Sequence, residues 1–230
     1  MLKLLPLLLA AACVTVSPTG KQATAGPKVD DFHAVEISSA IEATVAIGPT
    51  AVRIDADEAV LPYVKTKVVN GELKVWLEKD GVFFTRVGTV KATIVTPQLD
   101  SVEASGASRI TAQMTASKSC ALETSGASEV KVTGLACETL SVEASGASNI
   151  DAVGTAGKID ISASGASEVG VRQVTAAIVS VEGSGASEVH AFASSTLNAD
   201  LTGGTSLYVS GKPGQRSIEA TGGASIVDAE

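Results

Sequence analysis

The tetrapeptide Ser-Gly-Ala-Ser recurs through the second half of this chain at a nearly constant spacing, and two degenerate copies follow at 203–206 and 222–225. Measured from glycine to glycine, the successive steps are 20, 20, 19, 20, 19 and 19 residues. A repeat of this length is typical of one coil of a parallel β-helix, in which no coil can bury its apolar face alone and neighbouring coils stack. The marker glycines are Gly106, Gly126, Gly146, Gly165, Gly185, Gly204 and Gly223.

Apolar residues alternate with polar ones on both sides of the marker glycines, which is the period of a β-strand. In a stack of coils, with strands about 4.8 Å apart, each recurring apolar position becomes an inward column. The sequence therefore predicts an all-β fold, a parallel β-helix (β-solenoid) with one coil per repeat. Two such columns are Val102, Leu122, Val142, Ile161 and Val181, four residues before the glycine, and Ile110, Val130, Ile150, Val169 and Val189, four after it.

Each Ser-Gly-Ala-Ser unit is predicted to be a sharp corner, because the strands on both sides of it must point their apolar residues inward. Glycine tolerates the positive φ or the crowding that such a corner demands. The flanking Ala and Ser are small enough to stack, and the serine hydroxyls can bond neighbouring coils. We expect structural corners at Gly106, Gly126, Gly146, Gly165 and Gly185.

Residues 29–96 differ from the repeats and are predicted to form a β-rich N-terminal cap with irregular coils, continuous with the solenoid at 97–229. Asn70-Gly71, between 65–69 and 72–77, is the preferred two-residue turn of a β-hairpin. One helical turn is expected within 57–64, and 35–40 faintly echoes the repeat. Five of the seven aromatic residues lie here, as suits a cap over the open end of a solenoid.

The first residues are predicted to be a secretion signal. Lys3 precedes an apolar stretch at 4–9, far shorter than the roughly 20 residues that span a bilayer. Small residues directly before Cys13 resemble a bacterial lipobox, which implies cleavage before Cys13 and lipid on its thiol. Ordinary signal-peptidase cleavage and a different start codon are the alternatives. We expect a signal peptide at 1–12, lipid attachment at Cys13, and a flexible tether at 13–28, rich in Thr, Ser, Pro and Gly.

Two further cysteines are expected to be free thiols. Cys120 shares an inward column with Leu140, Ile159 and Val179, which predicts a small core residue. Cys137 falls eleven residues after Gly126, at a second corner of the coil. Because the two cysteines occupy different positions on the coil, a bridge between them is not predicted.

Acidic residues also form a column, on the outward side of the predicted strands. The net charge of −8 and the pI near 4.8 argue against binding of nucleic acid. The column is interpreted as an acidic solvated face that keeps the solenoid soluble; binding of cations or docking of a basic partner is the alternative. It comprises Glu103, Glu123, Glu143 and Glu182, interrupted by Ser162, and a second outward set holds Arg109, Glu129, Asn149, Glu168 and Glu188.

The sequence predicts neither catalytic residues nor a metal or cofactor site. His33 and His190 lie in opposite halves of the chain, so a histidine-based metal site or catalytic triad cannot be assembled. A paired-carboxylate glycosidase needs a cleft and sugar-stacking aromatic residues, and uniform columns on a convex face would supply neither. Polysaccharide-active β-helix enzymes also interrupt their coils with long loops, whereas the spacing here allows no insertion between Gly106 and Gly223.

The arrangement resembles the "putative autotransporter adhesin, head GIN domain" family of bacterial exported proteins. The resemblance covers roughly 31–228 and rests on Asn-Gly-Glu-Leu at 70–73, Val-Thr-Pro-Gln-Leu at 95–99, the Ser-Gly-Ala-Ser units, and Gly-Lys-Pro at 211–213. It implies a right-handed parallel β-helix in the cell envelope, and it carries over no catalytic or binding residues.

The predicted function is therefore a non-enzymatic envelope lipoprotein, a structural or adhesive module held to the membrane through Cys13. Its expected partner is a glycan, a matrix protein or an envelope protein, with periplasm or cell surface as its location. The alternatives are a cation-binding acidic face and, less favoured, a polysaccharide-active enzyme.

Overall fold

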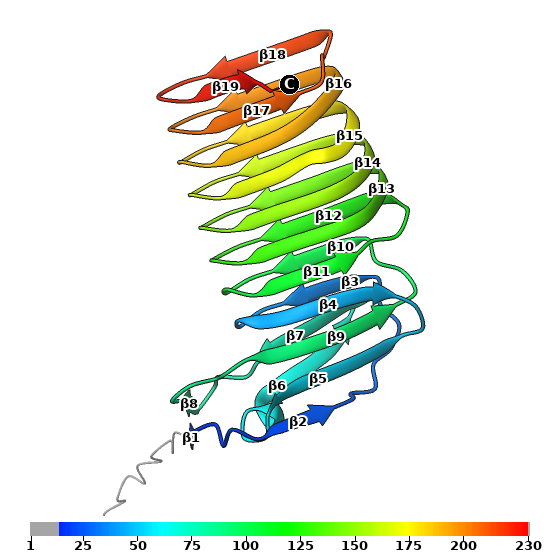
Figure 1. Ribbon diagram of the computed structural model, residues 1–230, viewed down its shortest axis with the longest axis vertical. Helices are drawn as coiled ribbons and strands as arrows, with labels where there is room; N and C mark the ends of the chain where they lie inside the picture. The colour runs from blue at the N-terminus through cyan, green and yellow to red at the C-terminus, as the bar shows by residue number, and fades with distance from the viewer. Residues whose placement is uncertain (1–13, 230) are drawn as a thin grey trace, which may run out of the picture.

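The computed structural model describes residues 14–229 as a single stack of β-strands, with the early strands at one end and the last strands at the other (Figure 1). The signal peptide and Cys13 lie outside the described residues. The 3-10 turn η1 (Leu61–Tyr63) is too short to cross a membrane, as is any helix in this part of the chain. In chain order the strands are β1 (Val14–Val16), β2 (Gln22–Ala25), β3 (Ala34–Ile37), β4 (Ile41–Ile47), β5 (Ala51–Asp57), β6 (Val64–Val69), β7 (Glu72–Leu77), β8 (Val82–Phe84), β9 (Val90–Thr96), β10 (Ser101–Ala104), β11 (Arg109–Gln113), β12 (Ser117–Thr124), β13 (Glu129–Ala144), β14 (Asn149–Ala163), β15 (Glu168–Gly183), β16 (Glu188–Leu201), β17 (Ser206–Ser210), β18 (Gln215–Ala220) and β19 (Ser225–Asp228).

The repeats form the predicted β-solenoid. Strands β13 to β16 each run from one Ser-Gly-Ala-Ser corner round a bend to the next corner, and each pairs in parallel with the strand of the following coil. The predicted inward column stacks in register, with Val102 beside Leu122, Leu122 beside Val142, and Val142 beside Ile161. These side chains are at most 2% exposed, so the columns are the core of the molecule.

The corners are built as predicted in the five full copies, where each marker glycine has a positive φ between 66° and 80°. At successive corners the backbones touch: Ala147 N donates to Gly126 O at 2.7 Å, and the same bond recurs at the corners that follow. The markers chosen for the last two copies were wrong by one residue. The register pairs Glu188 with Ser206, which places Gly203 on Gly185, and the positive φ there belongs to Gly203 and then Gly222.

The earliest coil of the stack comes from the N-terminal segment. Strands β3 and β4 meet at a corner where Ser39, with φ 69°, lies under Gly106. β3 pairs in parallel with β10, and β4 with β11, so this coil continues the repeat stack. Its other side pairs with β7 and β9, which places it between the repeats and the cap (Figure 1). The faint sequence echo at 35–40 was thus a true coil.

The N-terminal end is closed by antiparallel pairs. β6 and β7 form the predicted hairpin, with positive φ at both Asn70 and Gly71. β5 pairs antiparallel with β9 on one edge and with β2 on the other. The helical turn η1 follows β5, and Tyr63 meets Phe84 edge to face at 5.5 Å. Part of the predicted tether is therefore structured, since β1 pairs with β8 and β2 adds a strand to the cap.

Cys120 and Cys137 form a disulfide, so the prediction of two free thiols was wrong. The sequence reasoning placed them correctly at different positions of the coil, but the strands of consecutive coils lie side by side. Cys137 pairs in register with Ser117, only three residues before Cys120, and the chain bends at this point. Their Cα atoms come within 6.1 Å, a separation that a disulfide spans.

Candidate binding groove

The predicted outward glutamates stand one above another on a single face of the solenoid. In-register pairing places Glu103 beside Glu123 and Glu123 beside Glu143, and Ser162 then separates Glu143 from Glu182. The column is longer than the sequence predicted, because Asp200 pairs with Glu182 and Glu219 with Asp200. We call Glu36, Glu103, Glu123, Glu143, Glu182, Asp200 and Glu219 the carboxylate column.

Asp200 and Glu219 were missed because of the misplaced markers. Counted from Gly203 and Gly222, both residues lie three positions before the corner glycine, like the other members of the column. Counted from Gly204 and Gly223, they fall one position away from the glutamates. Glu36 was missed because its coil has Ser39 where the repeats have glycine.

The carboxylate column borders a groove of about 530 Å³. The expectation that the glutamates stand on a convex face was therefore wrong. The other wall is formed by the first residue of each corner, Ser125, Ser145, Ser164, Ser184 and Thr202. The bottom of the groove, between the two walls, is lined by small residues, which give the groove its depth: Ala144, Ala163 and Gly183 are examples. A shallower depression lined by Asn198, Ser217 and Glu219 continues along the column toward the C-terminal end.

The charges of the column are not neutralised within the groove. In the described part of the chain, Glu123, Glu143 and Glu182 form no ion pair with a basic side chain. Partial burial, followed by the neighbouring carboxylates Glu36 and Glu123, raises the pKa of Glu103. Partial burial and then the adjacent Glu143 raise the pKa of Glu123. Burial of the charge is the larger cause of both shifts and repulsion by neighbouring carboxylates the second, which Lys74 offsets only in part at Glu103.

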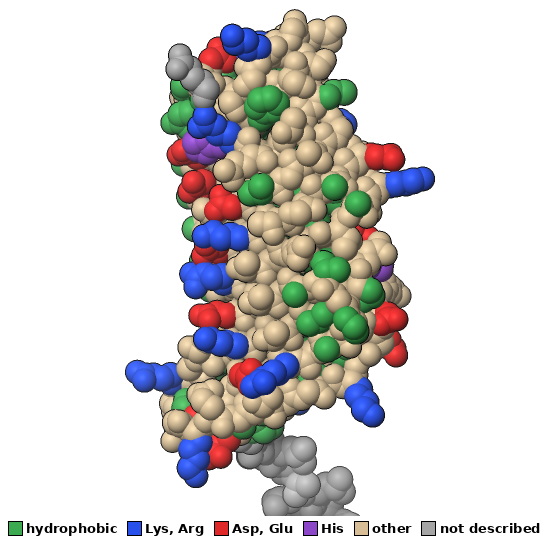
Figure 2. Space-filling view, turned by 45° about the vertical axis from the view of Figure 1, so that its right-hand side comes forward, with side chains coloured by type: hydrophobic (Ala, Val, Ile, Leu, Met, Phe, Trp, Pro, Cys, Tyr) green, Lys and Arg blue, Asp and Glu red, His purple; other side chains and the backbone are tan. Residues whose placement is uncertain are grey.

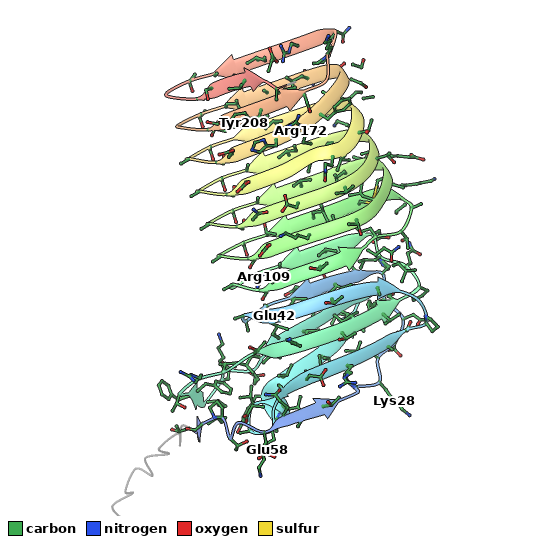
Figure 3. All side chains as sticks on the ribbon, in the orientation of Figure 1. Lys28, Glu42, Glu58, Arg109, Arg172 and Tyr208 are labelled. Carbon is green, nitrogen blue, oxygen red and sulfur yellow. A yellow bond between two sulfur atoms is a disulfide. The ribbon has the colours of Figure 1, made fainter. Side chains whose placement is uncertain are left out.

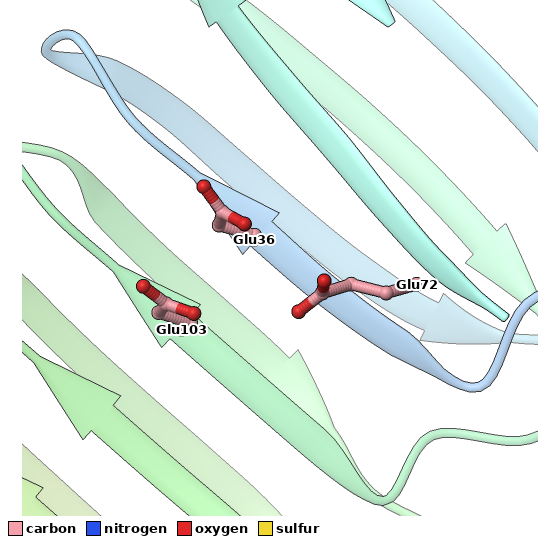
Figure 4. Close-up of side chains that lie close together, drawn as sticks. All are labelled: Glu36, Glu72 and Glu103. Carbon is pink, nitrogen blue, oxygen red and sulfur yellow. The ribbon is translucent and has the colours of Figure 1, made fainter. Parts of the chain in front are cut away.

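At its N-terminal end the column does meet a cation. The carboxylates of Glu36, Glu72 and Glu103 converge on neighbouring strands within 4.8 Å of one another (Figure 4). Lys74 lies among them, pairing with Glu36 and, at 2.9 Å, with Glu72. Because an ammonium group already compensates these carboxylates, the cluster is a salt-bridge network rather than a vacant metal site. Trp76 lines a small depression beside Glu36 and Lys74.

The second outward set, on the other face of the solenoid, contains an ion-pair network at its N-terminal part. Glu129 pairs with Arg109 at 2.6 Å and with Lys131 at 2.7 Å, and Arg109 stands beside Glu42 on the neighbouring strand (Figure 3). Asn149 donates to Glu168 at 3.4 Å. Basic and acidic groups thus meet at the N-terminal part of this face, and Glu168 then stands beside Glu188. Among the described residues, the charged side chains that line the groove are all carboxylates.

The two histidines lie apart, and each has its own carboxylate neighbour. His33 Nδ1 is 2.9 Å from Asp100, and His190 Nε2 is 2.7 Å from Glu188. His190 also stacks on Tyr208 at 4.6 Å between ring centroids. On the side of the bends, exposed hydrophobic residues such as Val153 and Ile178 are scattered among small polar ones, and the charged side chains gather toward the margins (Figure 2).

The stacked coils, glycine corners and antiparallel cap can be compared with known proteins. The family model described as "Putative auto-transporter adhesin, head GIN domain" matches residues 31–213. The chain belongs to this family. The head GIN domain accounts for most of the described stack, from β3 to the loop before β18. No curated protein shows a significant sequence match.

Solved structures share the fold of this head GIN domain. A putative adhesin from Bacteroides fragilis has a TM-score of 0.85 at 20% identity, over 92% of this chain and 98% of that one. A putative adhesin from Parabacteroides distasonis has a TM-score of 0.72 at 18% identity, over 93% of this chain and all of that one. A putative lipid binding protein from the same organism has a TM-score of 0.67 at 17% identity, over 93% and 100%. The family description implies an envelope or surface location, and none of these relatives is described as an enzyme.

Proposed function

We propose that this protein is a non-enzymatic envelope lipoprotein that uses the carboxylate groove as an adhesive contact for a basic segment of a matrix or envelope protein. The observation that carries the proposal is the contrast between the two long faces. On one face Glu129 pairs with both Arg109 and Lys131, whereas the other face lines a groove with Glu123, Glu143 and Glu182, which form no ion pair with Lys or Arg among the described residues. Lys and Arg side chains of a partner would supply the missing counter-charge and relieve the repulsion along the column.

Several features favour binding over catalysis. Among the described residues, the groove is lined by serine, threonine, alanine, glycine and carboxylates, and by no aromatic side chain on which a sugar ring could stack. A glycosidase needs two carboxyl groups in different environments, held on either side of the sugar, whereas the groove carboxylates stand in one row along a single wall. Cleavage of a polysaccharide by the purified protein would contradict this part of the proposal.

The contact is tested with the mature protein on arrays of matrix proteins and glycans. For each ligand found, we expect the variant Glu123→Gln/Glu143→Gln/Glu182→Gln to bind at least about 10-fold more weakly, and binding to weaken with added salt. The matched control is Glu168→Gln/Glu188→Gln, which removes carboxylates from the opposite face and should leave binding unchanged. Equal binding by the groove variant and the wild type would refute the groove as the contact.

The lone tryptophan gives an independent readout of the same binding. Trp76 lies beside Glu36, at the N-terminal end of the carboxylate column, so its emission reports on occupancy of that end only. A basic peptide that spans the groove should shift the emission of the wild type. A ligand that binds without shifting the Trp76 emission occupies the part of the groove nearer the C-terminal end. Capture of a neutral glycan that is insensitive to salt would instead favour a glycan as the partner.

A cation is the second candidate ligand, because burial and then the neighbouring carboxylates raise the pKa of Glu103 and of Glu123, and a bound cation would offset both effects. Calcium titration followed by calorimetry tests it. Binding that disappears in Glu123→Gln/Glu143→Gln, and persists in the opposite-face control, would favour the cation over the basic segment. Calcium binding unaffected by both variants would exclude the groove as its site.

Anchoring is tested separately, at a residue outside the described structure. If Cys13 carries the lipid, Cys13→Ser should release the protein from the membrane fraction without changing its affinity for a soluble ligand. Retention of the variant in membranes would refute the lipid anchor and leave the proposal for the groove intact.

A further inference from the structure

The C-terminal end of the solenoid is an open edge. β18 pairs only with β16, and β19 only with β17, so each presents one unpaired side (Figure 1). On the inward side, Ile218 is 39% exposed and Ile226 is half-buried, whereas Leu197 and Leu207 in the coil beneath are fully buried. An unpaired edge over an apolar core is a template for pairing with another chain.

The last coil breaks the inward pattern at two positions. Arg216 pairs in register with Leu197, and Asp228 with Val209, so both charged residues occupy inward columns that are apolar in the coils beneath. The two side chains meet over the open end of the core between β18 and β19, which we call the mouth of the solenoid. Arg216 Nη1 donates to Asp228 Oδ2 at 3.1 Å, and Nη2 donates to Oδ1. The bidentate pair satisfies both groups within the last coil.

The opposite end of the molecule is protected by other means. Its β2 edge is only four residues long and lies between Pro18 and Pro27, and its β6 edge carries Lys65 and Lys67. Short strands, prolines and lysines are established protections of a sheet edge. β18 and β19 contain neither proline nor lysine, although β19 is as short as β2 and Lys212-Pro213 precede β18, so the inward charges are the feature that distinguishes this end.

We propose that the C-terminal end is a latent self-association surface, and that the inward pair of Arg216 and Asp228 prevents a second copy of this chain from stacking on it. A second copy would cover the mouth and remove both charges from water. The side chains that face the mouth besides this pair are small or apolar: Ile218, Ala220, Ala224 and Ile226. Since the N-terminal end is protected, two copies can meet only through their C-terminal ends, which closes a two-fold dimer and does not build a fibre.

The test replaces the pair by the residues of the preceding coil, in the variant Arg216→Leu/Asp228→Val. We expect a dimer in sedimentation equilibrium, with self-association about 100-fold tighter than in the wild type, because two apolar side chains replace two charges at the interface. The matched control, Ser217→Leu/Glu219→Val, adds the same side chains at outward positions of β18 and should stay monomeric.

The proposal is overturned if the folded apolar variant remains monomeric, if the control dimerises equally, or if the wild type already associates through this end. Should the apolar variant fail to fold by circular dichroism, the variant Arg216→Gln/Asp228→Asn, which removes both charges and keeps polar side chains, decides the question. A dimer, weaker than that expected of the apolar variant, supports the proposal, and a monomer refutes it. This surface is distinct from the carboxylate groove, so neither result depends on the proposed function.

Discussion

Glycine at the corners of the inner coils is held by two constraints at once. Gly146 has φ 80°, in the left-handed region that side chains with a Cβ rarely adopt. A Cβ on Gly146 would also lie 2.5 Å from the carbonyl oxygen of Gly126, a backbone atom that accepts the hydrogen bond from Ala147. The clash therefore cannot be relieved without breaking the contact between two coils.

We expect Gly146→Ala to lower the free energy of unfolding by about 3 kcal/mol, from backbone strain and the clash together. The control Gly214→Ala should have little effect, since no atom lies within 4 Å of its Cβ position. The loss of stability in Gly106→Ala should lie between these two values, because the atom nearest to its Cβ position, Ser39 N, is 3.3 Å away. Urea denaturation followed by circular dichroism measures all three, and equal losses at Gly146 and Gly214 would contradict this account.

The last serine of each repeat is buried and bonded rather than catalytic. Ser128 Oγ accepts from the backbone N–H groups of Ala107 and Ser108 at 3.3 Å, and Thr124 donates to Ser148 at 2.9 Å. These hydroxyls satisfy backbone and side-chain groups where the ladder between coils is interrupted by the corner. A small polar residue is thus required inside, at a position that the alternating pattern marks as core.

At the scale of elements, the disulfide ties β12 to β13 beside the bend, where pairing between these coils stops at Gln113 with Thr133 and resumes at Ser117 with Cys137. The register of the following pair shifts between Val132 and Leu135, close to Cys137. Cys120 is 3% and Cys137 9% exposed, so the bridge lies in the core cluster. It holds the bend of one coil against the next where hydrogen bonding alone is interrupted.

Removing the bridge in Cys120→Ala/Cys137→Ala should lower the free energy of unfolding by about 3 kcal/mol, as expected for a loop of this length. A reductant should lower the thermal midpoint of the wild type and leave that of the double variant unchanged, which makes the variant its own control. Two reactive thiols at these positions in the unreduced, denatured protein would show that the bridge does not form.

At the scale of the whole molecule, the carboxylate column links stability to pH. The pKa of Glu103 and of Glu123 is raised above the ordinary value of 4.5 in the folded state. Each therefore binds its proton more tightly when folded than when unfolded, so the stability of the fold decreases as the pH rises from 4.5 through the raised pKa values. The cost of burying the two charges, and the repulsion that adds to it, are fully present at neutral pH.

Glu103→Gln/Glu123→Gln should accordingly raise the thermal midpoint at neutral pH by a few degrees, and the gain should shrink as the pH falls toward about 4. The control Glu168→Gln/Glu188→Gln, on the opposite face, should show no such gain at neutral pH. Thermal melts at several pH values measure the difference. A gain that stays constant across this range would mean that the column is not under charge repulsion.

The features of the fold that could be predicted from the sequence are those that repeat locally along the chain. The coil length, the inward columns, the five corner glycines and the Asn-Gly hairpin all depend on residues within one repeat or one turn, and the structure confirms them. The glutamate column was predicted as far as its markers were correct. Its extension to Glu36 and Asp200 needed the register between coils, which a one-residue change in coil length displaces.

The sequence by itself determined the period of this protein, since alternation within a strand and a glycine at each corner are local requirements of the chain. The tertiary structure alone decided which residues meet. Stacking places Cys120 next to Cys137 of the following coil, and it lines up the acidic residues as one wall of a groove. It also brings Arg216 within hydrogen-bonding distance of Asp228 over the open end of the core. Residues that touch in a solenoid are about one coil apart in sequence. Which residues touch therefore depends on the exact number of residues in the strands and bends between them.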